Sequence, residues 1–136
     1  LLLSASATPI PDIVALAATP SGDGILKLPG PNGSNAFAVS AVNVGSTDTI
    51  TATPGPSVVL PLVMSICQTD ATGACLSPAG SSATSTVEAD ATPTYSVFVT
   101  ATATVPFDPA NNRIVVEFTD SGGVVRGSTS VAVTTQ

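Results

Sequence analysis

Turn-forming residues interrupt this sequence about every 8–12 positions, and this spacing limits the segments between them to the length of short β-strands. Clusters such as Pro20-Ser21-Gly22-Asp23-Gly24 and Asp120-Ser121-Gly122-Gly123 combine residues that favour tight turns. Between the clusters Val, Ile and Thr are frequent, and β-branched residues suit a pleated surface better than a helix. No window offers a long run of Leu, Glu, Lys and Arg at helical spacing. The pattern therefore predicts an all-β chain.

Alternating apolar and polar side chains predict eight or nine strands, each with one buried face. In Arg113–Thr119, for example, Ile114, Val116 and Phe118 share a face while Glu117 points away. We expect Pro54-Gly55-Pro56 to end a strand and Phe107 to plug one end of the sandwich. The predicted strands are residues 12–19, 25–28, 36–44, 49–53, 58–68, 82–89, 95–104, 113–119 and 124–134.

Unequal loops between short strands favour an immunoglobulin-like antiparallel β-sandwich with Greek-key connections over a barrel. The length of 136 residues suits one domain, because two cores of half this size would each be marginal. We assign this domain to residues 12–136. Residues 1–11 are apolar, small and proline-bearing, and we expect them to form an arm or a linker.

Charged residues make up only 9% of the chain, against roughly 25% in an average soluble domain. The basic residues are Lys27, Arg113 and Arg126, and the net charge of −6 argues against nucleic acid as a partner, because phosphate binding needs clustered Lys and Arg. No segment approaches the roughly 18–20 apolar residues of a membrane span. So few charges leave the surface to hydroxyl and amide groups, to glycans or to neighbouring subunits.

The two cysteines, Cys67 and Cys75, bracket a turn that contains Thr, Asp and Gly. We expect a disulfide that closes a hairpin loop and stabilises the fold by roughly 2–3 kcal/mol; free thiols are the alternative. A disulfide implies an oxidising compartment. A zinc site would need four ligands, and the chain has no His to contribute.

Catalysis finds little support in the sequence. Without His, a Ser-His-Asp or Cys-His arrangement is impossible, and we interpret Glu88, Asp90 and the other carboxylates as solvated surface charge. Asp23 and Asp120 stand in turns that could offer oxygen ligands to calcium, but neither turn has the dense Asp and Asn spacing of a calcium loop. We therefore expect no enzyme activity, no cofactor and no metal site. Asn32-Gly33-Ser34 matches an N-glycosylation acceptor, so Asn32 is a candidate attachment site.

Five segments of the chain carry a resemblance: Thr92–Val99, Val105–Arg113 and Asp120–Val133, together with Ser65–Thr69 and Gly73–Leu76 around the cysteines. In these segments the chain resembles the immunoglobulin-like repeat modules of large bacterial secreted and cell-surface proteins, and the resemblance covers roughly residues 12–136. Its motifs are structural, so it implies a fold and a cell-surface setting but carries over no functional residue.

Two functions remain open. The first is a non-enzymatic structural module or subunit of an extracellular assembly, with copies of itself or neighbouring domains of the same surface protein as partners. In this hypothesis alternate residues of the arm add a strand to the open sheet edge of a neighbour; the arm residues are Leu1, Leu2, Leu3, Ala5 and Ala7. The alternative is an adhesive module that recognises a glycan or a host protein through its loops.

Overall fold

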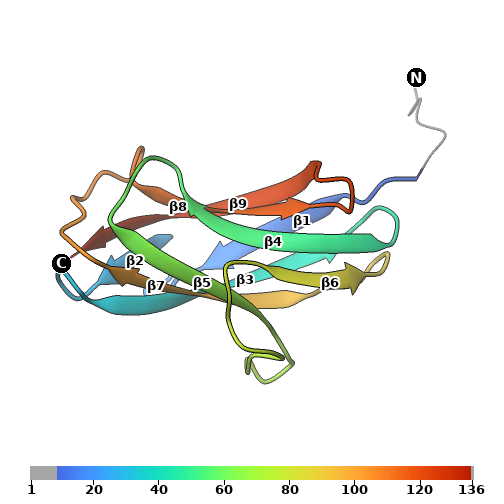
Figure 1. Ribbon diagram of the computed structural model, residues 1–136, viewed down its shortest axis with the longest axis horizontal. Coiled ribbons are helices and arrows are strands. Elements are labelled where there is room, and N and C mark those ends of the chain that lie inside the picture. The colour runs from blue at the N-terminus through green and yellow to red at the C-terminus, as the bar shows by residue number, and fades with distance from the viewer. Residues whose placement is uncertain (1–8, 136) are drawn as a thin grey trace.

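The computed structural model describes residues 9–135, and these residues form nine β-strands and no helix (Figure 1). Within this part, accordingly, no helix could span a membrane. The strands are β1 (Ile13–Ala18), β2 (Ile25–Leu28), β3 (Ser34–Asn43), β4 (Asp48–Pro56), β5 (Leu62–Thr69), β6 (Ala83–Val87), β7 (Thr94–Ala101), β8 (Arg113–Thr119) and β9 (Val125–Thr135).

The strands form two sheets that pack face to face. One sheet has four strands in the order β1-β3-β7-β5, and the other has five in the order β2-β9-β8-β4-β6. All neighbours are antiparallel except β2 and β9, which run parallel. Between β4 and β7 the chain changes sheet at every connection, so that sequence neighbours are not sheet neighbours. This arrangement confirms the predicted immunoglobulin-like β-sandwich.

The core lies between the sheets and is built from alternate residues of the central strands. Phe37, Val39, Val97 and Val99 of the first sheet face a second layer of inward side chains, which are Leu26, Leu28, Ile50, Ala52, Ile114, Val116, Phe118, Val131 and Val133. Tyr95 is buried with its ring centroid 5.6 Å from that of Phe118. Burial raises the pKa of Tyr95 to about 12, and its hydroxyl has no hydrogen-bond partner among the described residues.

The structure shifts several strand bounds, most of all the start of β5, which is Leu62 rather than residue 58, and it corrects two further details of the sequence prediction. Phe107 does not plug the sandwich; its side chain is 63% exposed, and Val105 is buried instead. Residues 54–56 do not end a strand but continue β4 alongside β8. The N–H of Ser57 donates to Arg113 O of the β8 side (2.9 Å). N–H direction alternates along a strand, so the backbone nitrogens of Pro54 and Pro56, which carry no hydrogen, face away from β8. On that side β6 has already ended, so the two prolines cost no hydrogen bond between strands.

The described chain enters and leaves the sandwich at opposite ends (Figure 1). At the entry end, Ile10 O accepts from Ser46 N (2.9 Å) and Pro11 is buried, so residues 10 and 11 lie against the β3–β4 turn. At the exit end, Thr135 N donates to Val105 O (3.0 Å) beside the β7–β8 connection. We call these the entry end and the exit end.

Candidate functional site

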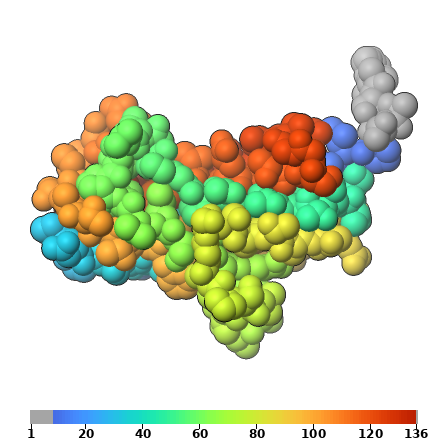
Figure 2. Space-filling model, viewed as in Figure 1, coloured from blue at the N-terminus to red at the C-terminus, as the bar shows by residue number. Residues whose placement is uncertain are grey.

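The predicted disulfide is present and organises the most prominent loop of the molecule. Cys67 and Cys75 have Cα atoms 5.5 Å apart, within the usual range. Cys67 points to the outer face of the four-stranded sheet but is buried, because the loop folds over it. This cysteine loop, residues 70–80, projects from the body of the sandwich (Figures 1 and 2). Closing nine residues should stabilise the fold by about 2.5 kcal/mol on the chain-entropy estimate.

The cysteine loop also closes the outer edge of β5. Ile66 and Gly80 exchange two backbone hydrogen bonds (2.8 and 3.1 Å), and Leu76 N donates to Gln68 O (2.9 Å). Unpaired strand edges invite pairing with other chains. The loop therefore removes most of the β5 edge from the positions where a foreign strand could add.

Two turns share one design that the sequence shows as Asp-x-x-Gly. In the cysteine loop, Asp70 Oδ1 accepts from the N–H groups of Thr72 (2.8 Å) and Ala74 (3.1 Å), and Gly73 has φ +88°. In the β8–β9 hairpin, Asp120 Oδ1 accepts in the same way from the second and fourth residues after it. The pKa of Asp70 is lowered, most strongly by the hydrogen bond from the Thr72 hydroxyl and further by those from the backbone N–H groups.

The remaining predicted site residues lie apart from this loop. Asn32 is exposed in the β2–β3 loop at the exit end, with φ +70°. Leu1, Leu2, Leu3, Ala5 and Ala7 lie outside the described residues.

The carboxylates considered for calcium are engaged by their own neighbours. Asp23 forms an ion pair with Lys27 (Oδ2–Nζ 3.0 Å), and the Ser21 hydroxyl, Lys27 and the Ile25 N–H lower its pKa to about 2. Asp120 pairs with Arg126 (Oδ2–Nε 2.7 Å). Within residues 9–135, no three side chains of the types Asp, Glu, Cys or His come together as a metal site would require.

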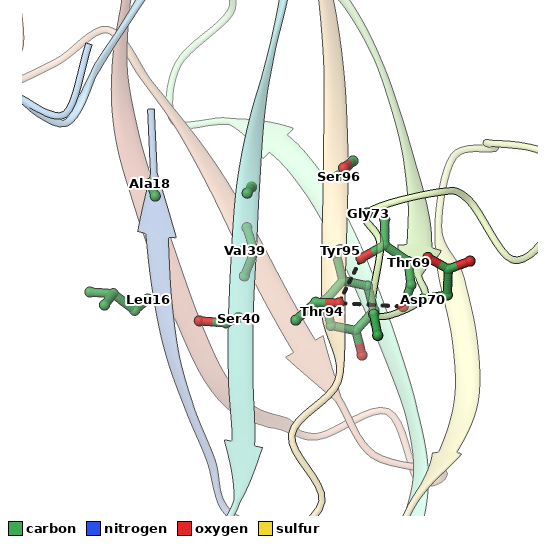
Figure 3. Close-up of a pocket in the computed structure, with 12 residues that line it drawn as sticks. Leu16, Ala18, Val39, Ser40, Thr69, Asp70, Gly73, Thr94, Tyr95 and Ser96 are labelled. Carbon is green, nitrogen blue, oxygen red and sulfur yellow. Dashed lines mark hydrogen bonds between the residues drawn. The ribbon is translucent and has the colours of Figure 1, made fainter. Parts of the chain in front are cut away.

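A shallow hollow of about 320 Å³ lies on the outer face of the four-stranded sheet, between β1 and the cysteine loop (Figure 3). Leu16 borders one side and Gly73 of the loop borders the other. Ala18, Ala38, Ser40, Thr94 and Ser96 contribute to its lining. Thr94 is held in place by a hydrogen bond between its hydroxyl and that of Thr69 (2.6 Å). The lining is mostly apolar, and its polar side chains are hydroxyl groups and the carboxylate of Asp70.

The two sheets differ sharply in charge. None of the strands β1, β3, β5 and β7 contains a charged residue, whereas all three basic residues, Lys27, Arg113 and Arg126, lie in the five-stranded sheet. The outer face of the four-stranded sheet instead exposes Val14, Leu16, Ala38, Val63 and Phe98. We call this surface the neutral face.

Sequence reasoning did not identify the neutral face. The signal was present, because residues 13–18, 34–43, 62–69 and 94–101 all lack charges. The alternation of apolar and polar residues, however, does not indicate that these four segments belong to one sheet.

The other sheet edges are partly closed by the chain itself. Asn35 Nδ2 donates to Lys27 O on the outer edge of β2 (2.9 Å). Ile13 of β1 lies against Gly127 of β9, so closely that a Cβ there would overlap the Ile13 carbonyl. Among the described strands, β6 pairs with β4 alone. The outer edge of β6 is therefore one place that is open to strand addition.

No family of sequences matches this chain, and no curated protein matches it. Solved structures of similar fold include WR4, an MSP family member of C. elegans, with 11% identity, a TM-score of 0.46 and coverage of 91% of this chain and 97% of that one. PapD-like domain 7 of human CEP192 has 9% identity, a TM-score of 0.47 and coverage of 100% and 94%.

The major pilin subunit BcpA of Bacillus cereus, as its D312A variant, has 15% identity and a TM-score of 0.46; the similarity covers 95% of this chain but only 41% of the pilin. These likenesses concern the fold alone. The sandwich assignment itself stands on the strand order and pairing described above.

Proposed function

We propose that this chain is a non-enzymatic structural module of an assembly outside the cytoplasm, such as a surface fibre, a pilus-like filament or a surface protein. The observation that carries the proposal is the neutral face, an entire sheet surface without charged strand residues and with exposed Val14, Leu16 and Phe98. Large exposed apolar side chains gathered on an uncharged surface favour contact with a partner. The disulfide supports an oxidising compartment.

The positions of the chain ends support the same proposal. The described chain enters at one end of the sandwich and leaves at the other. Modules with this geometry can follow one another in a line, and an apolar arm at the entry end suits attachment to a neighbour. Such an arm would pair with the open outer edge of β6 through main-chain hydrogen bonds and so add a strand to the sheet.

Assembly of the protein and of an arm deletion tests the proposal. The deletion should remove residues 1–8 and not 1–11, because Pro11 is buried and Ile10 is hydrogen-bonded to the domain. By electron microscopy and light scattering we expect fibres or large particles from the full chain, and a folded but less assembled protein after deletion. A full chain that stays monomeric at every concentration would count against the structural function.

Substitutions within the arm test strand addition itself. In an added strand, Leu1, Leu3, Ala5 and Ala7 share one face. We expect Leu3→Ser to impair assembly more than the matched control Leu2→Ser, which lies on the other face. Equal effects would show that the arm does not act as a strand.

The exit end favours a second candidate, an adhesive module that binds through its loops. Val59 is 99% exposed there and Phe107 is largely exposed, although aromatic residues are scarce in this chain. Exposed aromatic residues on loops of a rigid scaffold are common anchors for partners. A glycan array tests this candidate: binding that Phe107→Ser abolishes would support adhesion, and an array without binders would argue against glycan recognition.

A further inference from the structure

We propose that the neutral face is a lateral contact between two copies of this chain, related by a two-fold axis, in which the exposed Leu16 of each copy enters the hollow of the other. This inference rests on the proposed structural function and names the surface through which it acts. A two-fold contact uses the same patch on both copies, so the patch must be complementary to itself.

The shape of the face meets this requirement. Leu16 is 73% exposed and projects from β1 at one side of the hollow, while the cysteine loop forms a ridge at the other side (Figure 3). Protrusion and hollow therefore lie next to each other on one surface. Rotation by 180° brings each protrusion of one copy over the hollow of the other. The central lining residues Ala38 and Ser40 are small and leave space for an apolar side chain.

The distribution of charge makes this face the part of the surface through which a second copy can dock with least repulsion. The chain carries a net charge of −6, so two copies repel each other over most of their surfaces. Carboxylates gather at the entry end, where Asp12, Asp48, Glu88, Asp90 and Asp120 lie on or beside the connecting turns. The neutral face presents no charged strand residue. The carboxylate of Asp70, which belongs to the cysteine loop and borders the hollow, keeps its charge but is hydrogen-bonded within its own turn. Two neutral faces therefore meet with far less like-charge repulsion than other parts of the surface.

The area of the face indicates a weak contact for each pair. Four strands about 4.8 Å apart, each contributing about seven residues at 3.4 Å, cover roughly 450 Å². Two such faces bury about 900 Å², somewhat less than the roughly 1,000 Å² of a stable specific interface, so the isolated dimer should be weak. In an assembly the contact gains strength, because it acts jointly with other contacts between the same copies.

Sedimentation velocity of the disulfide-intact protein tests the proposal, from about 10 µM to about 1 mM, the range expected for a small interface. The protein without residues 1–8 should be measured beside the full chain, so that contacts through the arm are separated from contacts through the face. We expect both to form dimers, and added NaCl to strengthen the dimers, because salt screens the repulsion between acidic copies. Dimers that weaken with salt would overturn the proposal.

Charge substitutions locate the contact. Leu16→Glu and Ala38→Glu each place a carboxylate on the neutral face and should weaken dimerisation at least tenfold. The control Thr49→Glu adds the same charge at an exposed outward position of β4, inside the other sheet, and should leave dimerisation within about twofold. Circular dichroism melting of each variant confirms that it is folded.

The outcomes separate this inference from the structural function. Fibres that form normally from Leu16→Glu and Ala38→Glu would overturn the neutral-face contact and leave the structural function intact. Dimers that appear only after removal of residues 1–8 would show that the chain's own arm covers the face, which also overturns the inference. A full chain that assembles in no condition would remove the structural function as well.

Discussion

Asn43 is fully enclosed at the entry end of the sandwich, and we predict that Asn43→Ala lowers the free energy of unfolding by about 3 kcal/mol. Its Nδ2 donates to Ser46 O (2.8 Å) and to Val87 O (3.1 Å). Its Oδ1 accepts from Gly45 N (3.0 Å) and from Asp12 N (3.2 Å). These four bonds use the whole capacity of the amide and join the start of β1, the β3–β4 turn and the end of β6.

The magnitude follows from what the substitution leaves behind. The bond to Val87 O is buried, so this carbonyl loses its partner without access to water, at a cost of about 1–3 kcal/mol. The other three bonds are partly buried or lie near the surface, so water replaces them in part and each costs about 0.5 kcal/mol. Against a total stability of 5–15 kcal/mol, a loss of about 3 kcal/mol is easily measured.

Urea denaturation followed by far-UV circular dichroism measures this loss, with an unchanged m-value as the sign that only stability changed. The control Asn111→Ala removes one exposed bond to Asp108 and should change stability by less than about 0.5 kcal/mol. Asn43→Asp keeps the shape, but an ionised carboxylate has no proton to donate to the two carbonyls. Burial then raises the pKa of the new carboxyl, so this variant should gain stability as the pH falls towards 5.

Either of two results would refute the reasoning. An Asn43→Ala protein within about 1 kcal/mol of the original would mean that water satisfies all four groups. An Asn43→Asp protein that gains stability as the pH rises from 5 to 8 would mean that the amide protons are not needed at this site.

Three further predictions test other parts of the sandwich. Gly127→Ala should destabilise the fold by about 1–3 kcal/mol in the same denaturation assay, because its Cβ would overlap the Ile13 carbonyl. The control Gly55→Ala has open space around its Cβ and should be nearly neutral, and equal effects of the two variants would contradict the close contact. Tyr95→Phe should leave stability unchanged or raise it by up to about 1 kcal/mol, since the buried hydroxyl has no partner; a clear destabilisation would show a hidden partner. Above about pH 10 the unfolded chain ionises its tyrosine before the folded one does, so the original protein loses stability there, and Tyr95→Phe should reduce that loss. The folded chain keeps Asp23 ionised down to about pH 2, whereas the unfolded chain protonates it near pH 3.9. The stabilisation from this carboxylate is therefore present above about pH 4 and is lost as the pH falls through about 2. NMR titration of the carboxyl group should find the low pKa, and Ser21→Ala should raise it; an unchanged pKa in that variant would contradict the assigned cause.

Much of the local structure could be predicted from the sequence, because it depends on short-range chemistry. Asp70-Ala71-Thr72-Gly73 and Asp120-Ser121-Gly122-Gly123 form turns because a carboxylate can accept from backbone N–H groups a few residues ahead and glycine tolerates positive φ. The disulfide followed from two cysteines placed either side of such a turn. Strand boundaries failed where proline was treated as a breaker, since Pro54 and Pro56 lie where no ladder donor is required.

The sequence by itself thus determined where the chain extends and turns, which side chains of each strand share a face, and how few charges the surface can carry. Only the tertiary structure decided which strands pair, and hence that four uncharged strands form one continuous face while every basic residue lies in the opposite sheet. It also decided that Val105, and not Phe107, is buried at the exit end. The physical reason is that alternation is encoded within a strand, whereas the choice of a neighbouring strand depends on contacts between residues far apart in the chain.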